Sequence, residues 1–100
     1  MPIRVSAGII VLDPQDRVAL VRHRKPGVYD FWVAPGGGVE DGEDICAAAS
    51  RKAMEEAGLA VEPARLIAIE QLTGIKSGTT SNTGFLHVTT VHRHCELTIP

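Results

Sequence analysis

The sequence predicts an α/β domain with a mixed β-sheet, and three observations support this class. Segments rich in β-branched residues lie in both halves of the chain, one segment with helical periodicity lies between them, and clusters of glycine and proline separate the segments. Strands on both sides of a single helix favour a sheet that contains parallel and antiparallel pairs. Because 100 residues suffice for one small domain, we assign residues 1–100 to a single unit.

The N-terminal part predicts a β-hairpin. Its strands are residues 3–12 and 17–23, and the connection contains Pro14, which suits the second position of a type I turn. Residues 24–30 hold proline, glycine and charged side chains and are typical of a loop. A short apolar segment, residues 31–33, follows this loop and ends before a run of three glycines.

The middle of the chain predicts one helix over residues 45–57. Asp44 is suited to be its N-cap, and Gly58 stands where a left-handed C-terminal cap is expected. We expect one side of the helix to pack on the sheet through small and apolar residues, namely Cys46, Ala47, Ala49, Ala53, Met54 and Ala57. The opposite, exposed side is expected to carry the charged residues Arg51, Lys52, Glu55 and Glu56.

The C-terminal part predicts two more strands. Residues 64–75 and 85–97 are rich in apolar and β-branched side chains, and the polar residues 76–84 between them are typical of a mobile loop. No second helix follows the last strand to cover the other face of the sheet. We therefore expect the C-terminal part of the fold to be missing from this chain.

Composition and charge argue against some classes of partner and location. The 10 Lys and Arg residues against 12 Asp and Glu residues give a net charge of −2, which argues against a nucleic-acid partner. The chain has no signal-like start and no run of roughly 20 apolar residues, so we expect a cytoplasmic protein without a membrane span. Cys46 and Cys95 are accordingly interpreted as free thiols.

The glycine run and the helix after it suggest a cation site. Gly36 begins a run of three glycines, which lets the backbone approach a ligand closely, and three acidic residues follow: Glu43, Glu55 and Glu56. Mg²⁺ prefers oxygen ligands and is commonly held by a few carboxylates together with substrate phosphates. The simpler alternative is a solvated helix face with ordinary ion pairs four residues apart along the helix.

These residues resemble a known pattern. The Nudix box is written GX5EX7REUXEEXGU, where U is a bulky aliphatic residue, and the 23 residues 37–59 match seven of its nine specified positions. The matching residues are Gly37, Glu43, Arg51, Glu55, Glu56, Gly58 and Leu59. The chain therefore resembles the Nudix (MutT-like) hydrolase family.

The resemblance implies a fold and an activity. The expected fold is a mixed sheet sandwiched by helices, and the expected reaction is hydrolysis of a nucleoside diphosphate linked to another group, with Mg²⁺ or Mn²⁺ as cofactor. Carried over by position, the metal ligands would be Glu55, Glu56 and the carbonyl of Gly36. The catalytic set would be Glu43, Arg51 and Glu55, in which Arg51 orients the acids and Glu43 supports the site.

Two residues depart from the box. Ala53 replaces the bulky aliphatic residue, and Lys52 replaces the first glutamate of the REUXEE segment, which is commonly a metal ligand in this family. Lys52 has three open interpretations: an internal counter-ion that weakens metal binding, a side chain that turns toward a substrate phosphate, or an incidental change in a fragment. Its ammonium can stand where a cation would otherwise sit.

Other residues are candidates for binding the phosphorylated substrate. Arg22 and Arg24 belong to a basic cluster at a strand end and, together with Gly37 and Lys52, form the predicted substrate-binding set. Tyr29 could stack on a base, and so could Trp32, although core packing is the simpler role for Trp32. Further candidates near the C-terminus are His92, His94 and Cys95, which do not form a compact zinc set.

Three hypotheses for the whole chain follow. The first is a metal-dependent hydrolase, the second is a Nudix-like module that binds a nucleotide without cutting it, and the third is a fragment whose sheet is completed in a homodimer. The substrate's base and leaving group are not encoded in the box, since such contacts usually lie in variable loops.

Overall fold

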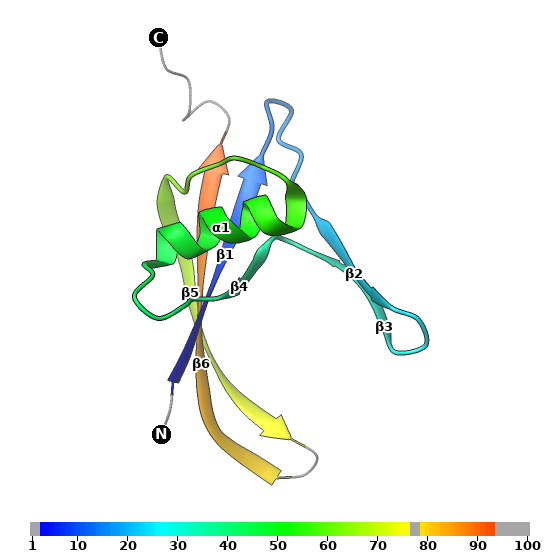
Figure 1. Cartoon of the computed structure of the whole chain (residues 1–100), viewed down its shortest axis with the longest axis vertical. Coiled ribbons are helices and arrows are strands. Elements are labelled where there is room, and N and C mark those ends of the chain that lie inside the picture. The colour runs from blue at the N-terminus through cyan, green and yellow to red at the C-terminus, as the bar shows by residue number, and fades with distance from the viewer. Residues whose placement is uncertain (1–2, 77–78, 94–100) are drawn as a thin grey trace.

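The structure, a computed structural model, describes residues 3–76 and 79–93, with the backbone alone over most of 72–85. The elements follow one another along the chain (Figure 1) as β1 (Ile3–Leu12), β2 (Val21–Lys25), β3 (Tyr29–Val33), β4 (Gly36–Gly38), α1 (Ile45–Ala57), β5 (Arg65–Lys76) and β6 (Thr79–Arg93).

Four of the strands form a mixed sheet, as predicted. Its strand order is β4-β1-β6-β5, in which β1 and β6 run parallel and the other neighbours run antiparallel. The parallel pairing extends from Ile3 opposite Gly84 to Leu12 opposite Arg93. β2 and β3 form a separate antiparallel hairpin, which projects away from the sheet below one end of α1 (Figure 1).

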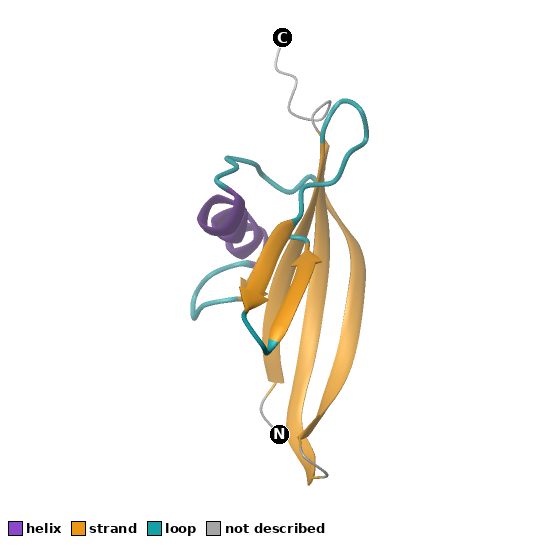
Figure 2. Ribbon diagram, turned by 90° about the vertical axis from the view of Figure 1, so that its right-hand side faces the viewer, coloured by secondary structure: helices purple, strands orange, loops and turns teal. Residues whose placement is uncertain are grey.

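One helix covers one face of this sheet (Figure 2). The core between them consists of small side chains and one larger one: Ala7, Ile9, Ala48, Ala49 and Ala53, all with no exposed surface. Alanines on both elements let the helix axis approach the strands closely, which confirms the prediction from the small residues of the helix. In the described part of the chain no helix has the length and apolar character that crossing a membrane demands.

The ends of α1 lie where the sequence predicts them. The Asp44 side chain accepts a hydrogen bond from the Ala47 amide at 2.7 Å, and Gly58 has a φ of 68°. The left-handed backbone at Gly58 lets the next amide, that of Leu59, donate to the Ala53 carbonyl at 3.2 Å. Local capping chemistry therefore determines both ends of the helix.

The prediction of which helix side is buried is partly wrong. Cys46 is exposed and Met54 is 51% exposed, whereas Ala48 is fully buried. The helix is rotated so that Lys52 and Glu56, expected on the exposed side, are mostly covered by neighbouring atoms. The reason is the glycine strand β4, which has no side chains and leaves room for long side chains of the helix to lie above it.

The predicted N-terminal hairpin is wrong in its pairing. A tight turn does follow β1, where Asp13 Oδ1 accepts hydrogen bonds from the Gln15 and Arg17 amides at 2.9 Å. The returning chain, however, meets β1 only through an isolated bridge between Leu12 and Val18. It then leaves the sheet, and β2 pairs with β3 instead.

Two predicted loops are largely strand. Residues 24–30 were expected to be irregular, but β2 and β3 are joined by a short turn in which Gly27 has a φ of 77°. Residues 76–84 likewise contain the end of β5 and the start of β6. The predicted strand end at 94–97 and the residues His94 and Cys95 lie outside the described residues. Cys46 is a free thiol, as predicted.

Removal of the helix cap tests the role of Asp44. We expect Asp44→Ala to lower the free energy of unfolding by about 1 kcal/mol, because the Ala47 amide loses its acceptor. The matched control is Asp41→Ala, which removes a nearby exposed carboxylate that does not cap the helix. Urea denaturation of both variants measures the difference, and equal stabilities of the two would contradict the capping role.

Candidate active site

Glycine is required at Gly36 by the close approach of two strands. A Cβ on Gly36 would lie 2.8 Å from the Ala7 carbonyl oxygen and 3.0 Å from the Cα of Gly8, both of which are backbone atoms of β1. No side chain can be accommodated there without moving a strand. The pairing of β4 with β1 therefore places bare backbone next to helix α1.

Gly37 leaves room for the flexible end of a helix side chain, which would have to move if a side chain stood here. A Cβ at this position would collide with the side chain of Lys52, whose Nζ lies 3.0 Å from the place that the Cβ would take. The Lys52 side chain is only 23% exposed because it lies over this glycine. Lys52 therefore faces the glycine strand, and the sequence had predicted it on the exposed side of the helix.

Arg51 connects three parts of the site. Its guanidinium binds Glu43 through two hydrogen bonds, Nε to Oε2 at 2.8 Å and Nη2 to Oε1 at 2.9 Å. Nη2 also donates to the Gly38 carbonyl, and Nη1 donates to Glu55 Oε1, each at 3.0 Å. A planar guanidinium is suited to such forked contacts. Arg51 thereby holds the end of β4, the loop before α1 and the last turns of α1 together.

These contacts change the pKa values of the acids. Hydrogen bonds from Arg51, and then from the Glu40 amide, lower the pKa of Glu43 from 4.5 to about 2. Hydrogen bonding to Arg51 also lowers the pKa of Glu55, and the same partners raise the pKa of Arg51. Glu43 is therefore fixed as an anion at neutral pH and is suited to hold Arg51 in place.

Glu55 and Glu56 point in different directions. Glu55 is 49% exposed, and its Oε2 lies 3.5 Å from the Lys52 ammonium. Glu56 is 21% exposed, accepts a hydrogen bond from the Gly36 amide at 2.9 Å, and places Oε2 at 3.7 Å from Nε2 of His23. The simple alternative of two ordinary pairs four residues apart holds only for Arg51 and Glu55, because Lys52 pairs with Glu55.

His23 is a site residue that the sequence reasoning missed. It stands between Arg22 and Arg24 of the basic cluster, and alternation along β2 turns it toward Glu56, whereas the two arginines are exposed. The His23 ring stacks on Phe31 at 5.4 Å between centroids. The alternation of a strand would have revealed it if β2 had been paired correctly.

The other substrate-binding candidates lie on the β2–β3 hairpin. Arg22 forms two hydrogen bonds with Asp30, at 2.7 and 2.6 Å, which raise the pKa of Arg22 and lower that of Asp30. Its guanidinium carbon also lies 5.8 Å from the centroid of the Trp32 ring. Trp32 is 61% exposed and Tyr29 is 45% exposed. The prediction that Trp32 packs in the core is therefore wrong.

A cavity of about 290 Å³ adjoins the glycine strand. Its lining includes Gly36, Gly37 and His23, and also Ser6 and His87, whose side chains form a 2.7 Å hydrogen bond. Ser6 alternates along β1 with the buried Ala7, which contacts the helix, so the cavity lies on the sheet face turned away from α1. Polar groups from three strands thus surround a space beside Gly36 and Gly37.

The site offers only a few protein ligands for a divalent cation. The described residues contain no group of three or more His, Cys, Asp or Glu side chains placed to hold a metal ion. The Glu56 carboxylate lies against the backbone of β4, and the Glu55 carboxylate is held beside Arg51 and Lys52. Since Mg²⁺ is commonly bound through one or two carboxylates together with waters and substrate phosphates, this donor set fits an ion completed by a substrate and not a cage made of protein alone.

Two proteins that are named as phosphate-cleaving enzymes share part of this sequence. It is 38% identical over 68 residues to an RNA pyrophosphohydrolase of Dinoroseobacter shibae, covering 68% of this chain and 42% of that protein. It is 39% identical over 62 residues to the human 8-oxo-dGDP phosphatase NUDT18, covering 62% of this chain and 19% of that protein. The chain thus spans less than half the length of these two relatives.

Solved structures share the fold and part of the sequence. A NUDIX hydrolase from Nitrosomonas europaea superposes with a TM-score of 0.74 at 28% identity, covering 93% of this chain and 59% of that one. A MutT protein from Bacillus halodurans gives a TM-score of 0.73 at 28% identity, covering 91% of this chain and 56% of that one. The sequence model of the NUDIX domain family matches residues 2–97 of this chain. With its box on the β4–α1 segment, the chain belongs to the NUDIX domain family.

Proposed function

We propose that this domain hydrolyses the pyrophosphate linkage of a nucleoside diphosphate joined to another group, with Mg²⁺ or Mn²⁺ as cofactor. The observation that carries the proposal is the contact set of Arg51, which holds Glu43, the Gly38 carbonyl and Glu55 at the glycine strand. The names of the relatives, a pyrophosphohydrolase and a phosphatase, support this reaction class. The substrate is accordingly a phosphorylated small molecule or a phosphorylated end of a larger one.

Each residue has a defined part in this proposal. Glu55 and Glu56, with the Gly36 carbonyl, would hold the ion, which when bound neutralises the diphosphate and activates water. Arg51 orients Glu55, and Glu43 keeps Arg51 in place. The Gly36 amide fixes the direction of the Glu56 carboxylate. These interactions orient the acids before the substrate arrives, so that little reorganisation is needed.

The substrate would lie along the glycine strand. The absence of a side chain at Gly37 leaves room for the end of Lys52, whose ammonium would neutralise a phosphate bound there. We assign the base or the leaving group to the cavity lined by His23 and His87. Arg22 and Arg24, on the β2–β3 hairpin, would supply further positive charge, Arg22 after release from Asp30.

A second candidate function is binding without cleavage, and one observation favours it. The Lys52 ammonium lies 3.5 Å from Glu55 and therefore occupies part of the space that a divalent cation would need. A cation approaching Glu55 experiences repulsion from this ammonium, which lowers its affinity. In that case the site would hold the phosphates of a nucleotide through Lys52 itself.

One experiment separates the two candidates. Product release from a panel of nucleoside diphosphate derivatives is measured with Mg²⁺ and with a chelator, for the wild type and for Lys52→Glu. We expect turnover by the wild type that the chelator abolishes, and turnover at least about tenfold faster in Lys52→Glu, because a repulsive charge is replaced by a ligand.

The control for charge is Lys25→Glu, which makes the same change at an exposed position on the hairpin. It should behave as the wild type. A silent wild type beside an active Lys52→Glu would support binding without cleavage. If both proteins are silent on every substrate in the panel and neither binds any of them, both candidate functions are wrong.

The Glu43–Arg51 pair predicts a dependence of stability on pH. The folded-state pKa of Glu43 is about 2 against 4.5 for the free side chain, so its contribution is fully present above pH 4.5 and is lost as the pH falls toward 2. We expect Glu43→Gln to be less stable than the wild type at pH 7, with the difference shrinking below pH 4.5. Urea denaturation at pH 7, 4.5, 3 and 2 measures it.

The matched control for this series is Glu40→Gln. Glu40 is 71% exposed and lies 3.7 Å from Arg51, so its removal should change stability little at any of these pH values. A Glu43→Gln variant whose deficit stays constant from pH 7 to pH 2 would show that the ionised pair is not the source of the stability.

A further inference from the structure

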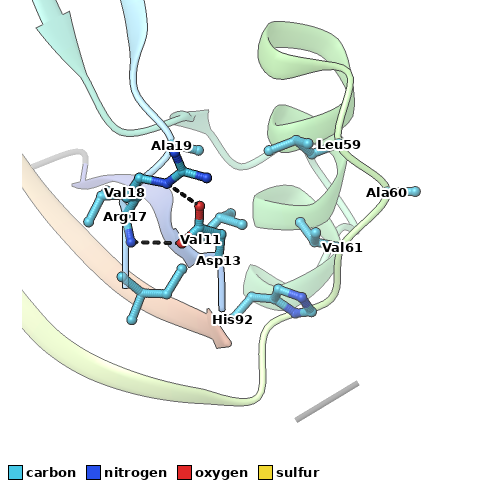
Figure 3. Close-up of a pocket in the computed structure, with 10 residues that line it drawn as sticks. Val11, Asp13, Arg17, Val18, Ala19, Leu59, Ala60, Val61 and His92 are labelled. Carbon is cyan, nitrogen blue, oxygen red and sulfur yellow. Dashed lines mark hydrogen bonds and ion pairs between the residues drawn. The ribbon is translucent and has the colours of Figure 1, made fainter. Parts of the chain in front are cut away.

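A second cavity lies away from the glycine strand. It has a volume of about 600 Å³ and is enclosed by the end of β1, the turn after it and the segment that follows α1 (Figure 3). Its walls are mainly apolar and include Val11, Val18, Leu59 and Val61. Leu59 and Val61 point toward β1 and the turn, whereas Ala60 points away (Figure 3). None of the box carboxylates lines this cavity.

His92 of β6 provides a polar atom in this apolar wall. Only 3% of His92 is exposed, and its Nδ1 lies 2.7 Å from the carbonyl oxygen of Glu62. A carbonyl oxygen accepts hydrogen bonds and does not donate them, so Nδ1 carries the hydrogen. In the neutral ring Nε2 is then a hydrogen-bond acceptor.

The Nε2 atom of His92 faces the cavity. It makes no hydrogen bond with any of the described residues. Among these residues, no side-chain nitrogen or oxygen atom is both sealed from solvent and without a hydrogen-bond partner, so Nε2 is accessible to solvent. Since the remainder of the ring is buried and His92 lines this cavity, its Nε2 is reached from there. A nearly buried side chain thus offers one acceptor, still accessible to solvent, at an apolar wall.

The rim of the cavity carries no net charge. Arg17 and Asp13 form an ion pair, with Nε and Oδ2 2.6 Å apart, and the Arg17 amide also donates to Asp13. These hydrogen bonds, first that of the Arg17 amide, lower the pKa of Asp13, so the carboxylate balances the guanidinium. Neither a cation nor an anion is therefore specifically favoured at the entrance.

We propose that this cavity binds a small, uncharged, apolar molecule that donates one hydrogen bond to His92 Nε2. Its volume lies in the range of about 300 to 1,000 Å³ that is typical of small-molecule sites, which combine apolar walls with a few polar groups that fix orientation. An apolar ligand in the cavity would cover this acceptor, and a covered acceptor without a partner is costly, so a ligand with a matching N–H group gains specificity there. The proposal does not depend on the hydrolase activity.

A matched pair of probes tests the proposed donor. Indole has an apolar ring and one N–H group, and 1-methylindole has a similar ring without the donor. Each is titrated into the ¹⁵N-labelled protein, and amide shifts are followed by NMR. We expect saturable shifts at Ala19, Val61 and His92, and binding of indole about tenfold tighter than binding of 1-methylindole, since the methyl derivative leaves the covered acceptor without a partner.

Two variants locate the binding. His92→Phe keeps an aromatic ring and removes the acceptor, and should abolish the preference for indole over its methyl derivative. Because this buried substitution could affect folding, Val18→Trp provides an independent test: Val18 is 44% exposed at the cavity wall, and a large ring there should fill the space and weaken both probes. Val28→Trp, at a 67% exposed position on the hairpin, is the control and should change nothing.

The outcomes are distinguishable. Saturable binding lost in Val18→Trp and kept in Val28→Trp supports the cavity, and the loss of the indole preference in His92→Phe supports the acceptor. Shifts that do not saturate, or that centre on exposed Trp32 and β5 instead, would overturn the proposal. Equal affinities of the two probes for the wild type would overturn the role of His92 Nε2.

Discussion

The paired hydrogen bonds between Arg51 and Glu43 are the interaction on which the rest of the site depends. Glu43 lies before the helix, Arg51 lies in its second turn, and the same guanidinium reaches the carbonyl at the end of β4 and the carboxylate of Glu55. One side chain therefore sets the distance between the helix and the glycine strand. Helix capping by Asp44 and the small residues of the core support the same geometry from either side.

Lys52 changes the electrostatics of this arrangement without changing its shape. Its stem uses the space above Gly37, and its ammonium stands beside Glu55, so the acids of the last helix turns are balanced by the chain itself. A box with glutamate at this position would concentrate negative charge there and would need an external cation to relieve the repulsion. Lys52 thus relieves this repulsion from within the chain.

The parts that sequence predicted well are those determined by neighbouring residues. The box spacing, the limits of α1 and the strand character of residues 3–12 depend on local capping and periodicity. The partner of β2 and the rotation of α1 could not be predicted, because both depend on tertiary contacts, with Phe31 and Trp32 opposite β2 and with the bare backbone of β4 under the helix. His23 and the exposure of Trp32 were missed for the same reason.

The parallel pairing of β1 with β6 has a consequence for how the chain folds. Ile3 of β1 must meet Gly84 of β6, so the central pair of the sheet closes a loop of roughly 80 residues. Contacts between residues so distant in sequence are slow to form, because the entropy of loop closure is lost before the contact contributes. On the ribosome, β1 has to wait until β6 has been made before this neighbour is available. Until then, one edge of β1 has no partner strand. Charge on the nascent chain or a bound chaperone would protect this edge from pairing with other chains.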